Sequence, residues 1–204
     1  MIGLAAVALL IAGQQATPVF APVGTHPYVI SSSSMAPTLD EGDVVLANRP
    51  RGECGTVAPE PGDVVIIRRG SAPWIRRIVA GPGQTVQMID GELHIDGVAV
   101  PRERSAPVDD SQFAHFGALA ETVAVWRETL PGGRTYLTLD FGPGGMLDDT
   151  ALVTVSGGHW FTMGDSRDNA VDGRIDGPTA ANELCGVALQ VVRSADPARV
   201  GVRP

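Results

Sequence analysis

The sequence predicts an all-β fold built mostly from antiparallel strands. Three observations support this prediction: short runs of β-branched residues, paired Asp-Gly turns, and 25 glycines and 16 prolines among 204 residues. Frequent glycine and proline favour short segments joined by turns over long helices. With 44% hydrophobic and 19% charged residues, the chain has enough apolar side chains to form a core and is not a disordered polyelectrolyte.

The expected strands follow one another from residue 28 onward. The runs DVVLA (43–47) and DVVII (63–67) each follow a glycine turn and are apolar enough for buried strands. The segment QMIDGELHIDGVAV (87–100) alternates apolar and polar residues around two Asp-Gly pairs, which is the strongest hairpin signal in the chain. Further strands are expected at 74–79, 85–89, 124–126, 134–139, 152–155, 160–163 and 184–192, and one helical turn at 180–184.

The N-terminal residues 1–13 are continuously apolar and are followed by Gln14 and Gln15. A membrane-spanning helix needs roughly 20 apolar residues, so a run of this length leaves two alternatives open. Residues 1–24 are a membrane anchor, or they are a buried or surface segment. A signal peptide would begin with a positive region, whereas the first basic side chain of this chain is Arg49.

The charged residues exclude several classes of function. Fifteen basic residues against 23 acidic ones give a net charge of −8, which has the wrong sign for a nucleic-acid-binding protein. All fifteen basic residues are arginine, so the chain contains no lysine. This excludes a P-loop, a Schiff base and every mechanism that uses a lysine amine.

Cys54 and Cys185 are the only cysteines of the chain. Two thiols this far apart in sequence form no CxxC pair, and by themselves they make no structural zinc site. We expect two separate thiols, with a single disulfide in an oxidising compartment as the alternative.

Four segments carry the candidate chemistry. Residues 30–39 read ISSSSMAPTL, residues 42–45 GDVV, residues 75–83 IRRIVAGPG and residues 163–174 MGDSRDNAVDGR. In this order and spacing they resemble the conserved boxes of the bacterial type I signal peptidases, serine peptidase family S26. The resemblance covers most of the chain, from about residue 28 to residue 192.

The resemblance implies a signal-peptidase-like β core with an inserted second β subdomain, preceded by the short apolar N-terminal segment. The core would comprise residues 25–86 and 159–193, the insertion residues 87–158, and a tail residues 194–204. The implied protein is a serine endopeptidase at the bacterial inner membrane with its β domain facing the periplasm. It would remove signal peptides from exported preproteins after an Ala-x-Ala-like site. Its expected partners are these signal peptides and the membrane, and no cofactor, metal or nucleic acid is expected.

The same resemblance assigns roles at the site. The nucleophile maps onto Ser34, and a donor to the oxyanion maps onto Ser32, beside the backbone N–H of Ser34. Acyl transfer needs a nucleophile and preorganised donors within about 3 Å of the developing oxyanion. Ile30 and Met35 are expected to form part of a shallow apolar pocket for small side chains.

The chain departs from the family at the general base. In the family this base is a buried, neutral lysine, and Arg76 occupies its position here. Arginine is effectively always protonated in proteins, and making it neutral at pH 7 would require its pKa to fall by about 6 units, or roughly 8 kcal/mol. Two family serines near the lysine map onto Ala170 and Gly173, so three changes affect one proton-transfer site.

Two alternatives to a lysine base remain. In the first, a histidine serves Ser34, although His26, His94, His115 and His159 are each more simply explained as surface or half-buried residues. In the second, the chain keeps the cleft without the activity. Arg76 then pairs with a carboxylate as a fixed cation that favours an anionic or carbonyl ligand.

The acidic run at 165–176 is interpreted as a salt-bridged turn. Its spacing does not fit the EF-hand pattern, so no metal site is expected there. The resemblance implies that Asp165 pairs with Arg77 and Asp172 with Arg174, which would hold the conserved segments together near the candidate nucleophile. Solvated charges on a loop are the alternative.

Two hypotheses for the function follow. The leading one is a signal peptidase I-like enzyme that cleaves preproteins through Ser34. The alternative is a catalytically impaired or silent homologue that binds signal peptides or exported chains without cleaving them.

Overall fold

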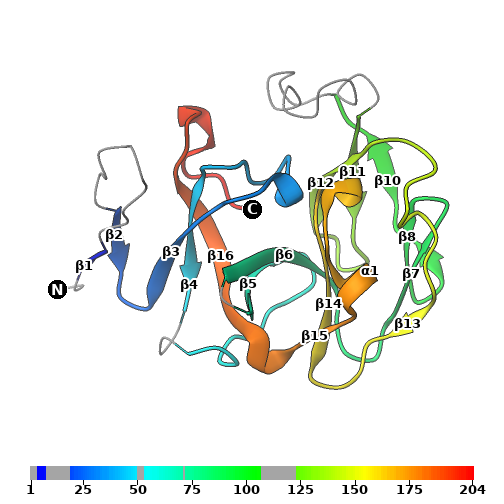
Figure 1. Ribbon diagram of the computed structural model, residues 1–204, viewed down its shortest axis with the longest axis horizontal. Coiled ribbons are helices and arrows are strands. Elements are labelled where there is room, and N and C mark those ends of the chain that lie inside the picture. Colours follow the sequence, from blue (N-terminus) through cyan, green and yellow to red (C-terminus); the bar gives the residue numbers. More distant parts are fainter. Residues whose placement is uncertain (1–3, 8–18, 50–52, 71, 107–122) are drawn as a thin grey trace.

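The computed structural model describes residues 4–7, 19–49, 53–70, 72–106 and 123–204, and it confirms the predicted, mostly antiparallel all-β fold. The described strands form sheets of seven, four, three and two strands (Figure 1). Helical structure in the described residues is confined to single turns. They are η1 (Ser33–Met35), η4 (Arg167–Asn169), α1 (Gly173–Asp176), η5 (Ala181–Glu183) and η6 (Pro197–Arg199).

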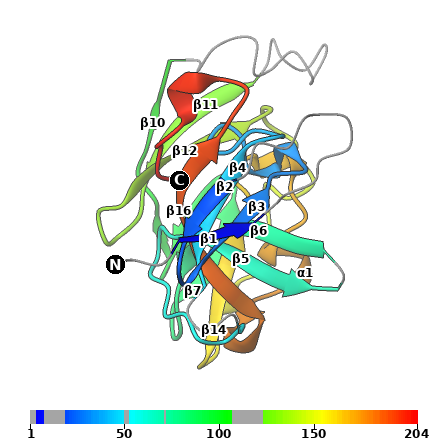
Figure 2. The same ribbon diagram turned by 90° about the vertical axis from the view of Figure 1, so that its left-hand side faces the viewer.

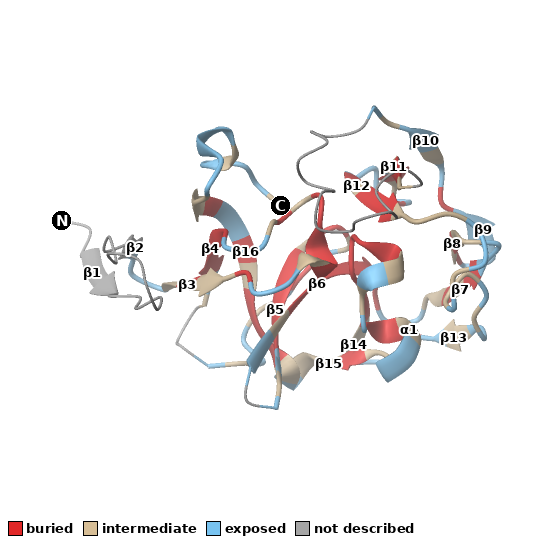
Figure 3. Cartoon of the chain, turned by 45° about the horizontal axis from the view of Figure 1, so that its top comes forward, coloured by how far each residue is buried: buried red, intermediate tan, exposed pale blue. Residues whose placement is uncertain are grey.

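The seven-stranded sheet has the order β15-β14-β6-β5-β16-β4-β3, and all its pairings are antiparallel. Strands from the first and second halves of the chain therefore lie side by side in it, since β14 pairs with β6 and β16 lies between β5 and β4. Its members are β3 (Thr25–Val29), β4 (Val44–Asn48), β5 (Val64–Arg69), β6 (Ala72–Ala80), β14 (His159–Met163), β15 (Thr179–Ala180) and β16 (Leu184–Arg193). Buried residues concentrate on β4, β5 and β6 (Figure 3), in agreement with the apolar runs of the sequence.

The middle of the chain forms two smaller sheets. One contains β7 (Thr85–Ile89), β8 (Glu92–Ile95), β9 (Val98–Ala99) and β13 (Val153–Thr154), and the other β10 (Arg102–Arg104), β11 (Ala124–Thr129) and β12 (Thr135–Asp140). The two Asp-Gly pairs form the predicted two-residue turns, and both residues of each pair have positive φ, with Asp90 at 49° and Asp96 at 54°.

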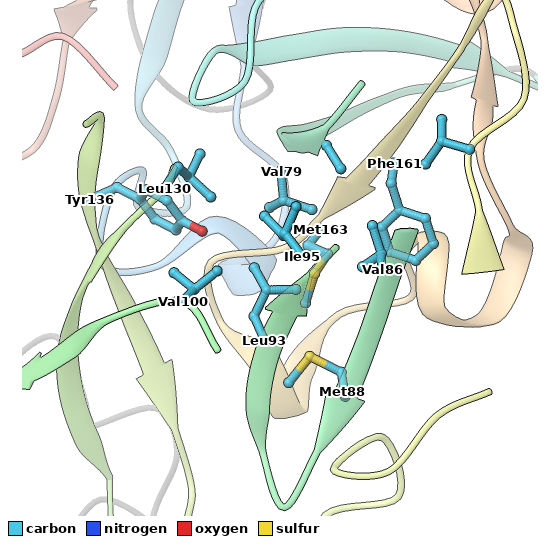
Figure 4. Packing of buried hydrophobic residues seen from close by; sticks show 12 residues of the cluster. Val79, Val86, Met88, Leu93, Ile95, Val100, Leu130, Tyr136, Phe161 and Met163 are labelled. Atoms are coloured by element: carbon cyan, nitrogen blue, oxygen red, sulfur yellow. The ribbon is translucent and has the colours of Figure 1, made fainter. Parts of the chain in front are cut away.

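A single apolar cluster joins the seven-stranded sheet to the smaller ones (Figure 4). Val79 of β6 and Phe161 of β14 contribute to it from the large sheet, and Val86, Leu93 and Tyr136 from the small sheets. The chain leaves the large sheet between Ala80 and Thr85, so β7 spans the expected boundary at residue 86. The division into domains stays a prediction.

The expected tail, residues 194–204, folds back onto the large sheet. The backbone N–H of Gly201 donates to the carbonyl of Val191 at 2.8 Å, and Arg199 forms ion pairs with Asp40 and Asp43. These contacts brace the segment that follows the candidate nucleophile.

At the other end, β1 (Leu4–Val7) pairs antiparallel with β2 (Val19–Pro22), next to β3 (Figures 1 and 2). In the described part of the chain, no helix has the length and apolar character needed to cross a membrane.

The expectation of two separate thiols is wrong, because Cys54 and Cys185 form a disulfide. The turn at 53–56 lies against the start of β16, where the backbone N–H of Gly55 donates to the carbonyl of Leu184 at 2.7 Å. This long-range contact brings together two residues that are 131 positions apart in sequence.

Candidate active site

The serine-rich segment turns sharply away from β3. The backbone of Ile30 pairs with Gly42 and Asp43, and the chain between them forms η1, in which Ser34 and Met35 are buried. On the other side, the carbonyl of Ser34 accepts a hydrogen bond from the backbone N–H of Ser166 at 3.1 Å. The candidate nucleophile is thus held between the segments that sequence analysis linked to it.

The Ser34 hydroxyl contacts two polar groups. Its Oγ lies 3.0 Å from Ser32 Oγ and accepts a hydrogen bond from Arg76 Nη1 at 3.0 Å. Sequence analysis therefore identified three residues that the fold brings together, Ser32, Ser34 and Arg76.

Arg76 is bound by backbone carbonyls. Its Nε and Nη2 donate to the carbonyl of Val171 at 3.1 and 2.6 Å, and its Nη1 donates to the carbonyl of Ile75 at 2.6 Å. Among the described residues, no carboxylate lies within ion-pair distance of Arg76, so the expected carboxylate partner is wrong. The loop after β14 supplies the carbonyl oxygen of Val171 instead, and β6 itself supplies that of Ile75.

Burial lowers the pKa of Arg76 from its usual value, while the carboxylate of Asp172 opposes the change. The carbonyl oxygens of Val171 and Ile75 accept hydrogen bonds from the charged form of Arg76 and so favour it. A guanidinium held in this way is a hydrogen-bond donor to Ser34 and not an acceptor of its proton.

Both of the expected ion pairs are present, Arg77 with Asp165 and Arg174 with Asp172. Arg77 leaves β6 on the opposite face from Arg76, as successive strand residues do, and binds Asp165 through Nε at 2.8 Å and Nη2 at 2.7 Å. Arg174 binds Asp172 at 2.8 Å, and the same carboxylate accepts from the backbone N–H of Gly164. The interpretation as solvated loop charges is therefore wrong for these four residues, which are almost completely buried.

A second buried network was not found by sequence analysis. Arg167 forms an ion pair with Glu128, which also accepts a hydrogen bond from the Tyr136 hydroxyl at 2.8 Å. The ring of Tyr136 lies 4.4 Å below the Arg77 guanidinium, and burial raises the pKa of Tyr136, so its hydroxyl remains a donor. No local pattern indicates Glu128, because it lies 39 residues from Arg167.

A pocket of about 200 Å³ opens beside the Ser34 hydroxyl. Ile30 and Met35, the two residues expected at its walls, both line it. Ser32, Ser34 and Arg76 are polar members of its lining, and Pro73, Trp74 and Ile75 of β6 are further apolar members.

The described histidines do not contact the Ser34 hydroxyl. His26 packs edge-on against Tyr28, His94 contacts the carbonyl of Glu92 and His159 that of Gly157. None of these three hydrogen-bonds to the serine hydroxyl, and His115 lies outside the described residues.

Comparison with known proteins identifies the family. The sequence model of the family described as signal peptidase, peptidase S26, matches residues 2–192 of this chain. The chain belongs to this family.

Individual signal peptidases are similar to this chain in sequence, at about 30% identity. A signal peptidase I from Bacillus amyloliquefaciens is 30% identical over 166 residues, which is 80% of this chain and 71% of that protein. Signal peptidase I T from Bacillus subtilis is 32% identical over 151 residues, 73% of this chain and 63% of its own length. A crystal structure of a signal peptidase I from Enterococcus faecalis aligns with 64% of this chain and 97% of its own, with 20% identity and a TM-score of 0.36.

Ala170 and Gly173, the two positions at which the resemblance implies that family serines are replaced, follow β14 in the chain, in the segment whose Val171 carbonyl binds Arg76. Gly164 lies between Ala170 and the nucleophile segment, because a Cβ added at Gly164 would be 2.4 Å from the Cβ of Ala170 and 2.7 Å from the carbonyl oxygen of Ser34. A Cβ at Gly173 would be 2.7 Å from the carbonyl of Thr162. A serine therefore does not fit at 173 without a backbone shift, whereas residue 170 already has a Cβ.

Proposed function

We propose that this signal peptidase family member receives signal peptides of exported preproteins in the cleft beside Ser34 and does not cleave them efficiently. The observation that carries the proposal is the hydrogen bond from Arg76 Nη1 to Ser34 Oγ. A serine attacks a carbonyl only if its proton moves to a base, and general-base catalysis contributes about 10²–10⁴-fold to the rate. Here the guanidinium of Arg76, which stands at the implied base position, donates a hydrogen bond to the serine oxygen instead of accepting its proton.

The cleft supports binding. Its polar end presents Ser32 and Ser34, and the apolar side chains of Ile30, Met35 and Ile75 surround a space suited to small residues. Such a space matches the Ala-x-Ala-like end of a signal peptide. Because binding a peptide requires only shape and hydrogen-bond donors, it does not depend on the missing base.

The second candidate is a signal peptidase that cleaves after small residues with Ser34 as nucleophile and Ser32 as oxyanion donor. Its support is the retained serine pair, 3.0 Å apart, and the intact ion pair between Arg77 and Asp165. Cleavage at a useful rate would then require a base that the described residues do not bring to Ser34.

The proposed location is the bacterial inner membrane, with the β domain facing the periplasm and residues 1–24 at the membrane. The disulfide between Cys54 and Cys185 supports a compartment outside the reducing cytoplasm, because structural disulfides persist in oxidising environments.

The test compares the parent protein with Ser34→Ala and, as a matched control, Ser156→Ala at an exposed site. Each protein is mixed with a preprotein that has an Ala-x-Ala signal peptide, or with its mature form. Binding is measured by light scattering or anisotropy, and cleavage by gel electrophoresis.

We expect all three proteins to bind the preprotein better than the mature form, and none to cleave it appreciably. Cleavage by the parent and by Ser156→Ala, but not by Ser34→Ala, would establish the enzyme instead. Equal binding of preprotein and mature form would overturn the proposed recognition of signal peptides.

A further inference from the structure

Within the described part of the chain, no carboxylate forms an ion pair with the positive charge of Arg76. Arg76 is only 8% exposed, and among the described residues it contacts carbonyls and a hydroxyl, not a carboxylate. The carboxylates that attract it are each in an ion pair with another arginine: Asp172 with Arg174, Asp176 with Arg69, and Asp165 with Arg77. One buried cation is therefore in excess at this position.

An uncompensated cation favours an anion nearby. Burying a charge is costly, and the cost falls when an opposite charge approaches in a region that excludes water. Arg76 is itself part of the lining of the pocket beside Ser34, so this attraction acts on whatever the pocket holds.

The hydroxyls of Ser32 and Ser34 lie next to this charge and add hydrogen-bond donors with defined directions. Because Ser34 Oγ accepts from Arg76, its own proton points elsewhere, toward Ser32 Oγ or toward the pocket. A hydroxyl that accepts a charge-assisted hydrogen bond becomes a stronger donor. Ser32 is exposed and supplies a second hydroxyl 3.0 Å away. Two donors and a cation match a carboxylate better than they match a neutral amide.

We infer that the pocket binds the free α-carboxylate of a peptide that ends in a small residue. The carboxylate oxygens accept from Ser34 and Ser32, with Arg76 behind them, and the terminal side chain contacts Ile30 and Met35. The volume of about 200 Å³ suits a terminal residue of this size.

This inference rests on the proposed function, because the peptide is a signal peptide after its release. A free carboxylate forms when an endopeptidase adds water across a peptide bond, leaving a carboxylate on one fragment and an amine on the other. Another peptidase therefore supplies the ligand, and this protein retains the cleaved end.

The test uses two synthetic peptides with the C-terminal region of a signal peptide and an N-terminal fluorophore. One ends in the free acid after Ala-x-Ala, and the other in the carboxamide. Affinities are measured by fluorescence anisotropy with the parent, with Arg76→Gln, and with Arg127→Gln as a control at an exposed arginine of β11.

We expect the acid to bind the parent and Arg127→Gln about ten- to a hundredfold more tightly than the amide, the range of a charged hydrogen bond. In Arg76→Gln this preference should disappear while the amide affinity changes little. Should Arg76→Gln fail to fold, the ratio of acid to amide in the parent decides the question.

Equal affinity of the parent for acid and amide overturns the inference, and the proposed function survives if the preprotein still binds. Tight binding of the acid without any binding of the preprotein would separate the two proposals in the other direction. It supports the carboxylate site and contradicts the reception of intact signal peptides.

Discussion

Exchanging the guanidinium for an amine tests whether a missing base is what limits cleavage. The perturbation is Arg76→Lys combined with Ala170→Ser, which introduces the family's residue types at two of the three positions where the resemblance implies a replacement. A lysine Nζ ends one bond short of Arg76 Nη1, which lies 3.0 Å from Ser34 Oγ, so a small shift brings it within reach of the hydroxyl. Residue 170 adjoins Val171, whose carbonyl holds the present side chain.

The expected gain follows from the proton affinities of the two side chains. Lysine has an ordinary pKa of about 10.4, roughly two units below that of arginine. If the pocket lowers both by the same amount, the neutral fraction at pH 7 is about a hundredfold larger for lysine, since each pKa unit is a factor of ten. We therefore expect the double variant to cleave a preprotein about a hundredfold faster than the parent.

The assay is a time course of preprotein cleavage that yields kcat/KM over a range of pH. The rate of the double variant should rise with pH, because only the deprotonated amine accepts the serine proton. Adding Ser34→Ala should abolish the gain, and Arg68→Lys, which places a lysine at an exposed position of β5, should produce none. A folded double variant that binds preprotein but cleaves no faster than the parent would refute the reasoning.

Two further predictions concern stability. Asp165→Asn leaves Arg77 buried without its ion pair, which should cost about 3–5 kcal/mol and, at about 2–4 °C per kcal/mol for a chain of this size, lower the Tm by about 6–20 °C. The change is followed by circular dichroism, with the exposed Glu41→Gln as control; a variant as stable as that control would contradict the importance of the pair. Reduction of the Cys54–Cys185 disulfide, which closes a loop across 131 positions, should lower the free energy of unfolding by about 2–5 kcal/mol. Unfolding in urea with and without reductant measures this, and identical midpoints would argue against a stabilising bond.

The elements that sequence analysis predicted are those that local patterns specify. The two Asp-Gly turns were predicted because only a few residue types adopt positive φ at both turn positions, and Asp90 and Asp96 do so. The apolar runs on β4 and β5 were predicted because strands buried on both faces are continuously apolar.

Contacts between distant segments were harder to predict. The pairing of Arg77 with Asp165 was expected only through the family resemblance, whereas the network of Arg167 with Glu128 was missed. The carbonyl of Val171 carries no signal in the sequence at all, because every residue type has the same backbone acceptor.

The sequence by itself determined that the chain is built of short strands and that it contains no lysine. Both follow from residue identity and local spacing, whereas the match of Arg76 to the position of the family's lysine is implied by the resemblance. Only the tertiary structure decided that Cys54 and Cys185 are joined and that Arg76 is bound by carbonyls while it donates to Ser34. These contacts depend on how strands far apart in the chain are placed in one sheet, and that placement is set by the packing of the whole core.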